Sequence, residues 1–282
     1  MISRWFLPLA CATLIPVSVA GGAVSPGPRP AFAIYGLPGT RANVKTVVRN
    51  TLAKTIPYYT RLTGVKLKRP VRVLILPNKW LFAMTAASMS RSLALGTLAR
   101  SAAGTSRGTI LINQEVVLKT GDHRTLPYFT AQELAHVYLQ QEGAGGHLYV
   151  WLLKAHMVNL AYKALANLGL IDEDGMRRRF LALVKGGRCP SLMEMATPKG
   201  YIRVCGRYDS KILYAFFYLA GDLLSRKCSQ YNIFSYYDRV TYEVYTSIFK
   251  SKDQAHEEFF KRIFGFNPGM LEKELHANIT NS

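Results

Sequence analysis

The chain has 282 residues, of which 49% are hydrophobic, and its mean hydropathy is +0.05. This length and composition exclude an intrinsically disordered chain and allow one large domain or two small ones. The net charge of +19 is spread unevenly, because the first acidic residue is Glu115 and residues 1–114 hold 15 Lys or Arg. So basic a segment favours an anionic partner: an anionic membrane surface, an acidic polymer or an acidic protein. A solvated basic surface with no specific partner would have the same composition.

The chain begins with the pattern of a signal peptide. A positively charged start precedes an apolar run from Trp5 to Ala20, and the small residues around Ala20 suit cleavage. The run is short for a membrane span and prolines interrupt it, which disfavours an uncleaved anchor. We therefore predict a signal peptide over residues 1–20 and an exported protein, whether periplasmic, secreted or envelope-associated. Export, together with the absence of zinc-finger, RNP and KH motifs, argues against nucleic acid as a partner.

Gly- and Pro-rich sequence follows and predicts a linker over residues 21–40. From Arg41 onwards apolar residues recur at helical spacing, which predicts a helix that Pro57 kinks or ends and that Gly64 closes. Basic residues line another face of this helix, where they would contact an anionic surface or simply face solvent: Arg41, Lys45 and Arg49.

A small sheet is expected next. Two apolar, β-branched runs predict strands over residues 71–76 and 109–113, separated by a helix over 79–90 and a loop over 104–108. Helical periodicity dominates later, with helices expected over residues 149–168, 172–184, 211–226, 234–249, 252–264 and 268–277. The predicted fold class is α+β and mostly helical, with an α+β part over residues 41–190 and a helical C-terminal part over 191–282.

The segment between the second strand and these helices contains Gln132-Glu133-Leu134-Ala135-His136. The helix that carries it starts at Thr125 or at Thr130. In the second case Glu133 would be a capping-box carboxylate with no chemical role. In zinc peptidases with a His-Glu-x-x-His motif, two imidazoles one helical turn apart hold the metal, and the Glu is the general base for the bound water.

Together with its surroundings, this motif resembles the peptidase MA-like, or gluzincin, family of zinc hydrolases. In that family a strand and a Gly-containing loop precede the metal helix, and a second helix supplies a glutamate as the third ligand. Residues 108–112 look like the strand, 132–136 like the metal helix and 151–157 like the ligand helix, and the diffuse similarity covers about residues 41–277. The resemblance implies a zincin-like fold, in which a small sheet packs on the metal helix and an all-helical part follows.

The resemblance also assigns the site positions. The family's first His falls on Gln132, its general base on Glu133, its second His on His136 and its third ligand on Lys154. A neutral amide is a poor zinc ligand, and an ammonium cannot coordinate a metal. We therefore expect no metal cofactor, with His136 as the ligand if one binds, and a catalytically inactive Glu133. We hypothesise that the charge of Lys154 replaces zinc beside Glu133, with Gln132 and His136 completing hydrogen bonds.

These expectations describe a non-catalytic pseudo-metallopeptidase that acts as a binding or scaffold module at an anionic surface. Two alternatives stay open. The chain could be an atypical zinc metallopeptidase whose substitute ligands come from other residues around His136, namely His123, Glu142, His147 and His156. It could instead be a basic surface-binding protein with no enzymatic ancestry.

Three cysteines follow the predicted signal peptide, so at least one thiol cannot form a disulfide within the chain. Cys189 and Cys205 could close a short loop in an oxidising compartment, leaving Cys228 unpaired. The spacing does not decide which pair forms.

Overall fold

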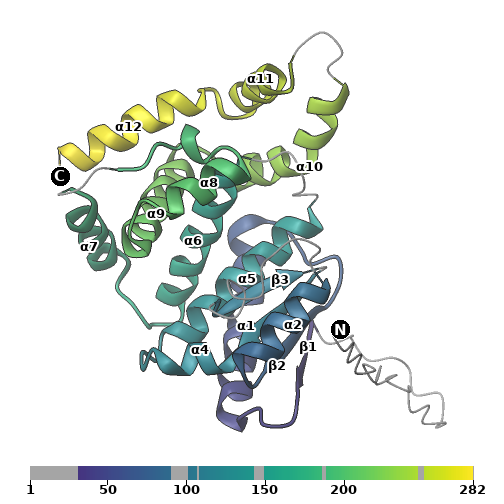
Figure 1. The fold of residues 1–282 in the computed structure, drawn as a ribbon. Coiled ribbons are helices and arrows are strands. Elements are labelled where there is room, and N and C mark those ends of the chain that lie inside the picture. The colour runs from purple at the N-terminus through teal and green to yellow at the C-terminus, as the bar shows by residue number, and fades with distance from the viewer. Residues whose placement is uncertain are drawn as a thin grey trace, which may run out of the picture.

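The computed structural model describes residues 31–89, 101–106, 108–142, 149–185, 189–246 and 251–281. The predicted α+β class is confirmed: a small sheet lies at one end of the molecule and helices make up the rest (Figure 1). The predicted signal peptide falls outside the described residues. In the part of the chain that is described, no helix is both long enough and apolar enough to cross a membrane.

The sheet has four strands in the order β1-β2-β4-β3: β1 (Phe32–Gly36), β2 (Val71–Leu76), β4 (Thr109–Asn113) and β3 (Ala103–Ser106). The first three run parallel, and β3 pairs with β4 in the antiparallel direction. The strands predicted over residues 71–76 and 109–113 are therefore confirmed.

Two strands correct the sequence-based prediction. Strand β1 lies inside the segment predicted as linker 21–40, because Phe32 and Ile34 turn towards the core and the backbone pairs with β2. Strand β3 lies in the predicted loop 104–108, although its sequence, Ala-Gly-Thr-Ser, has little strand propensity. It forms because its backbone completes the hydrogen bonds of β4.

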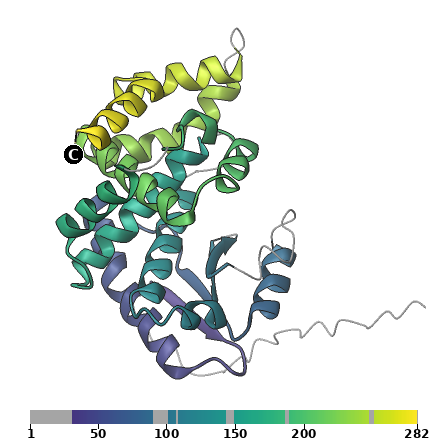
Figure 2. The ribbon, with the colours of Figure 1, turned by 60° about the vertical axis from the view of Figure 1, so that its left-hand side comes forward.

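Helices cover both faces of the sheet (Figure 2). On one face, α1 (Ala42–Thr63) packs its apolar stripe into the core cluster that contains the inward residues of β2 and β4. On the other, α2 (Lys79–Met89) packs Phe82 and Ala83 against Leu76 and Leu111. Of the two effects predicted for Pro57, an end to the helix is excluded, since α1 continues through it to Thr63; the predicted end at Gly64 is confirmed.

Helix α5 (Thr125–Gln141) follows the short helix α4 (Gln114–Lys119), which the sequence did not predict. Of the two predicted starts, Thr125 is confirmed. Thr130 lies inside the helix, where its hydroxyl donates to the Leu126 carbonyl at 2.8 Å, so Glu133 is not a capping-box residue. Tyrosines fasten α5 to α1: the Tyr59 hydroxyl donates to the Ala131 carbonyl, and the Tyr138 hydroxyl to the Ile56 carbonyl.

The helices that follow are α6 (Val150–Asn167), α7 (Glu173–Lys185), α8 (Pro198–Cys205), α9 (Ser210–Lys227), α10 (Gln230–Thr246), α11 (Lys252–Phe264) and α12 (Pro268–Thr280). The helical C-terminal part is confirmed, although α8 and a 3-10 turn at Met193–Met195 were not among the predicted helices. One hydrophobic cluster extends from the sheet through α5, α6 and α9 to α12, so the two predicted parts share a core.

The cysteines do not form the suggested bridge. Cys189, Cys205 and Cys228 are all free thiols, with Cys205 exposed and Cys228 buried.

Helices α6 and α9 lie in close contact at Gly221. A Cβ at this position would lie 2.3 Å from the Ala155 carbonyl oxygen and 2.7 Å from the Asn159 Cβ. The glycine therefore sets the spacing between the two helices, and through it the position of α6 against α5.

Gly221→Ala is expected to lower the free energy of unfolding by about 1–3 kcal/mol, because the added methyl group meets backbone that cannot move freely. Chemical denaturation measures this. Gly206→Ala is the control: its Cβ would make ordinary contacts, so its effect should stay within about 0.5 kcal/mol. Equal effects of the two substitutions would contradict the tight packing at Gly221.

Candidate functional site

Helix α5 carries Glu133 at the place where it passes under the edge strand β3. The Glu133 side chain is only 9% exposed, and its Oε2 accepts a hydrogen bond of 2.7 Å from the Thr105 hydroxyl. His136, one turn further along α5, places its Nδ1 3.8 Å from the same oxygen. The Glu133 carboxylate is thus held between a strand hydroxyl and an imidazole.

The pKa of Glu133 lies below its ordinary value despite this burial. Burial is the largest single influence and raises the pKa. His136, Thr105 and the positive charge of Lys154 lower it, and their combined effect is larger than that of burial. Glu133 is therefore ionised at neutral pH. A buried carboxylate that stays charged requires partners of this kind.

Lys154, on α6, acts on Glu133 from a distance. Among the described residues it forms no ion pair, and its Nζ lies 5.9 Å from the centre of the Tyr201 ring. The expected contact between Lys154 and Glu133 is therefore corrected to a longer-range attraction. The direct donor is Thr105, which the sequence analysis missed because strand β3 had been taken for a loop.

Gln132 does not bond to Glu133 either, because consecutive helix residues point in different directions. Gln132 is 5% exposed, and its Oε1 has no hydrogen-bond partner. It lines a cavity of about 170 Å³ together with Lys154 from α6, two residues of α8, and the start of α9. The structure thus brings Gln132 and Lys154 into one cavity, whereas Glu133 and His136 are not among its lining residues.

The substitute metal ligands do not come together. Across the described ranges, no group of three His, Cys, Asp or Glu residues could hold a metal ion. His123 lies beside Asp122, and Glu142 pairs with Lys68 at 2.9 Å. His156 is buried against Gln230, and burial lowers its pKa to about 4. His147 falls outside the described residues.

The predicted basic stripe occupies α1. Arg41 and Arg49 are exposed, and Lys45 is half-buried, with its side chain against Gly36. Within the described part of the chain none of the three forms an ion pair, so no carboxylate neutralises their charges.

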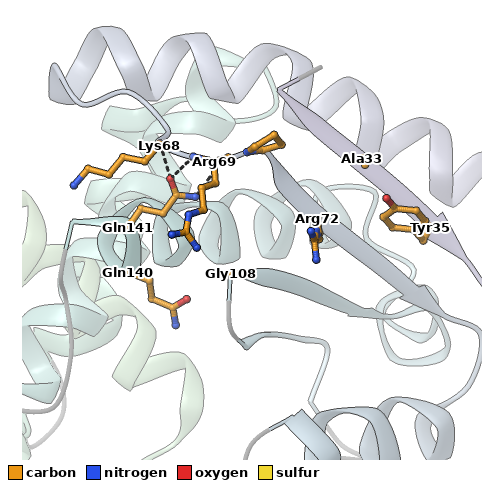
Figure 3. Close-up of a pocket in the computed structure, with 9 residues that line it drawn as sticks. Ala33, Tyr35, Lys68, Arg69, Arg72, Gly108, Gln140 and Gln141 are labelled. Carbon is orange, nitrogen blue, oxygen red and sulfur yellow. Dashed lines mark hydrogen bonds between the residues drawn. The ribbon is translucent and has the colours of Figure 1, made fainter. Parts of the chain in front are cut away.

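A second basic surface was not predicted. It is a groove of about 840 Å³ on the part of the sheet face that α2 leaves uncovered (Figure 3). Tyr35 and Arg72 project into it from β1 and β2, and Lys68 and Arg69 border it. The alternation of β2 was a usable signal, since Arg72 must face away from its buried neighbours Val71 and Val73.

The groove is fixed to the end of α5. The Gln141 side chain accepts hydrogen bonds from the backbone N–H groups of Lys68 and Arg69 at 2.7 and 3.1 Å, as drawn in Figure 3. Lys68 is neutralised by Glu142. Arg69 and Arg72 have no acidic partner among the described residues, so they provide the net positive charge of the groove.

Searches of protein-family models, curated proteins and solved structures returned no match to this chain.

Thr105→Val removes the hydroxyl that donates to Glu133 while keeping the side chain's shape. At neutral pH the variant should lose about 1.5–3 kcal/mol of unfolding free energy, because a buried carboxylate loses a donor. The Glu133 pKa is lowered in the folded state, so the stability it contributes is present at neutral pH and disappears as pH falls below the unfolded value, about 4.3.

The difference between the variant and the parent protein should therefore shrink in acid, as Glu133 becomes protonated. Denaturation curves at a series of pH values test this, with Thr109→Val in the neighbouring strand as the control. A constant difference at all pH values would show that Thr105 contributes packing alone.

Proposed function

We propose that this chain is an exported, gluzincin-like protein that has lost peptidase chemistry and acts as a binding module at an anionic surface. The observation that carries the proposal is the shared cavity of Gln132 and Lys154, the two positions where the family has metal ligands. The order of elements supports it too: strand β4, helix α5 and helix α6 occur in the order that the resemblance implies, with the short helix α4 between β4 and α5.

The residues at these positions do not fit a zinc ion. Lys154 carries a positive charge and no free lone pair, and Gln132 offers a neutral amide. A dication placed beside Lys154 would also be repelled. We therefore derive no metal-dependent step for Glu133, whose carboxylate is instead held by Thr105 and His136.

Restoring the family's ligands tests this ancestry directly. The double variant Gln132→His, Lys154→Glu recreates the ligand set with His136, so it should bind stoichiometric zinc, measured by elemental analysis after dialysis. A structural zinc site also stabilises the fold, so the melting temperature of the double variant should fall when a chelator is added.

Two controls make the outcome specific. His136→Ala in the double variant should abolish the zinc, whereas His123→Ala, on an exposed loop, should not. A double variant that folds but takes up no zinc would refute the proposed gluzincin geometry of α5 and α6.

The anionic surface is supported by charges that have no counter-ion within the described residues. The stripe on α1 contributes Arg41, Lys45 and Arg49, and the groove contributes Arg69 and Arg72. All five belong to the part of the chain that precedes Glu115. Basic groups near an anionic lipid surface contribute about 1 kcal/mol each, and salt screens this attraction.

Binding to anionic vesicles should therefore be strong at low salt and fall as salt is added. Arg69→Gln, Arg72→Gln should weaken it about thirtyfold, because two contributions of about 1 kcal/mol sum to about 2 kcal/mol. The charge-matched control Arg178→Gln, Arg179→Gln changes two exposed arginines of α7 and should have a much smaller effect. Equal losses in both variants would indicate attraction by net charge alone, and salt-independent binding would contradict the electrostatic role.

A further inference from the structure

The cavity that Gln132 and Lys154 line has an inner end and a mouth. Residues that are at least nine-tenths buried form the inner end: Gln132, Val158, Leu213 and Phe217. The exposed residues Cys205 and Ser210 also line the cavity, so they lie at its mouth. The cavity therefore opens to solvent between α8 and α9 and ends at α5.

The inner end contains an unsatisfied acceptor. Gln132 Oε1 is buried and has no hydrogen-bond partner, and a buried polar atom in this condition costs about 1–3 kcal/mol. The neighbouring Tyr214 also lines the cavity. Its pKa is raised by burial and by the charge of Glu133, and the amide group of Gln132 at its hydroxyl lowers it, which leaves Gln132 Oε1 without a donor. Tyr214 is therefore a neutral hydroxyl. A ligand with an N–H or O–H group would satisfy Gln132.

The side of the cavity carries a cation without an anion. Lys154 is half-buried and is not paired with any acid in the described ranges; Glu133 already has Thr105 as its donor. A ligand carboxylate at Lys154 would gain a charge-assisted hydrogen bond in partly desolvated surroundings. Val158, Leu213 and Phe217 would contact a short aliphatic group.

We propose that this cavity binds a small carboxylic acid that carries a hydrogen-bond donor on the adjacent carbon, the chemistry shared by amino acids and hydroxy acids. At about 30 Å³ for each water-sized group, 170 Å³ has room for about six non-hydrogen atoms. The carboxylate pairs with Lys154, the donor bonds to Gln132 Oε1, and the methyl group contacts the apolar residues. The inference rests on the proposed loss of the metal, because a zinc ion between positions 132 and 154 would take this space.

Four small molecules separate the parts of the ligand. Alanine and lactate carry both groups, propionate lacks the donor, and alaninol lacks the carboxylate. Titration calorimetry on the full chain should show that alanine, lactate or both bind at least about tenfold more tightly than propionate and alaninol. The difference between alanine and lactate then identifies which class is preferred. Equal affinity of all four, or binding by none, would overturn the proposal.

A matched pair of variants locates the binding. Lys154→Met should weaken the preferred ligand at least about tenfold, whereas Lys163→Met, on the same helix but outside the cavity, should leave it unchanged. Should Lys154→Met fail to fold, the unmodified protein gives an independent test. Ligand should slow the alkylation of Cys205 at the mouth and leave the alkylation of Cys189 unaffected.

Ligand that protects neither thiol, or both equally, would contradict binding in this cavity. This failure is distinct from failure of the proposed function. If the cavity binds no small acid, the zinc experiment on the double variant still tests the proposed function. Stoichiometric zinc in the parent protein would instead contradict both the proposed function and the proposed ligand.

Discussion

The ionised carboxylate of Glu133, buried under an edge strand, is the constraint on which the rest of the site depends. A charge in this position must be balanced by its surroundings, since desolvation opposes it more strongly than any other effect. Thr105 donates a hydrogen bond, His136 places a ring nitrogen 3.8 Å from the carboxylate, and the positive charge of Lys154 acts from a longer distance. Strand β3, helix α5 and helix α6 are therefore coupled through one side chain, and the Gly221 contact fixes how close α6 can come.

A lysine and a metal ion require different geometries of the groups around them. Zinc needs ligands at fixed distances and angles, whereas an ammonium at the end of a flexible chain stabilises a carboxylate without direct contact. In this chain Gln132 is a buried amide whose oxygen has no hydrogen-bond partner. Our proposals follow from this difference: we propose that the chain has lost the chemistry of hydrolysis, and that its small cavity with a cation and an acceptor binds a ligand instead. The basic groove on the sheet is separate from this cavity, so an anionic surface and a small acid would occupy different sites.

The sequence predicted the parts of the structure that have strong periodicity. Strands β2 and β4 and the long helices were predicted because their apolar residues repeat at the spacing of a strand or a helix. Strand β3 was missed because Ala-Gly-Thr-Ser has no such pattern and pairs only through its backbone. That miss concealed Thr105, the hydrogen-bond partner of Glu133. The motif identified Gln132, Glu133 and His136. A sequence pattern could not show that Lys154 makes no direct contact with Glu133, nor that Arg72 lies in a groove.

The metal content of the full-length protein, purified without chelators and dialysed, tests the central claim most directly. Elemental analysis should find far less than one zinc per chain, and a chelator should leave the melting temperature unchanged, because the charge of Lys154 and the hydroxyl of Thr105 already balance Glu133. Stoichiometric zinc whose removal lowers the melting temperature would contradict the account. Glu133 would then be the candidate general base for a zinc-bound water.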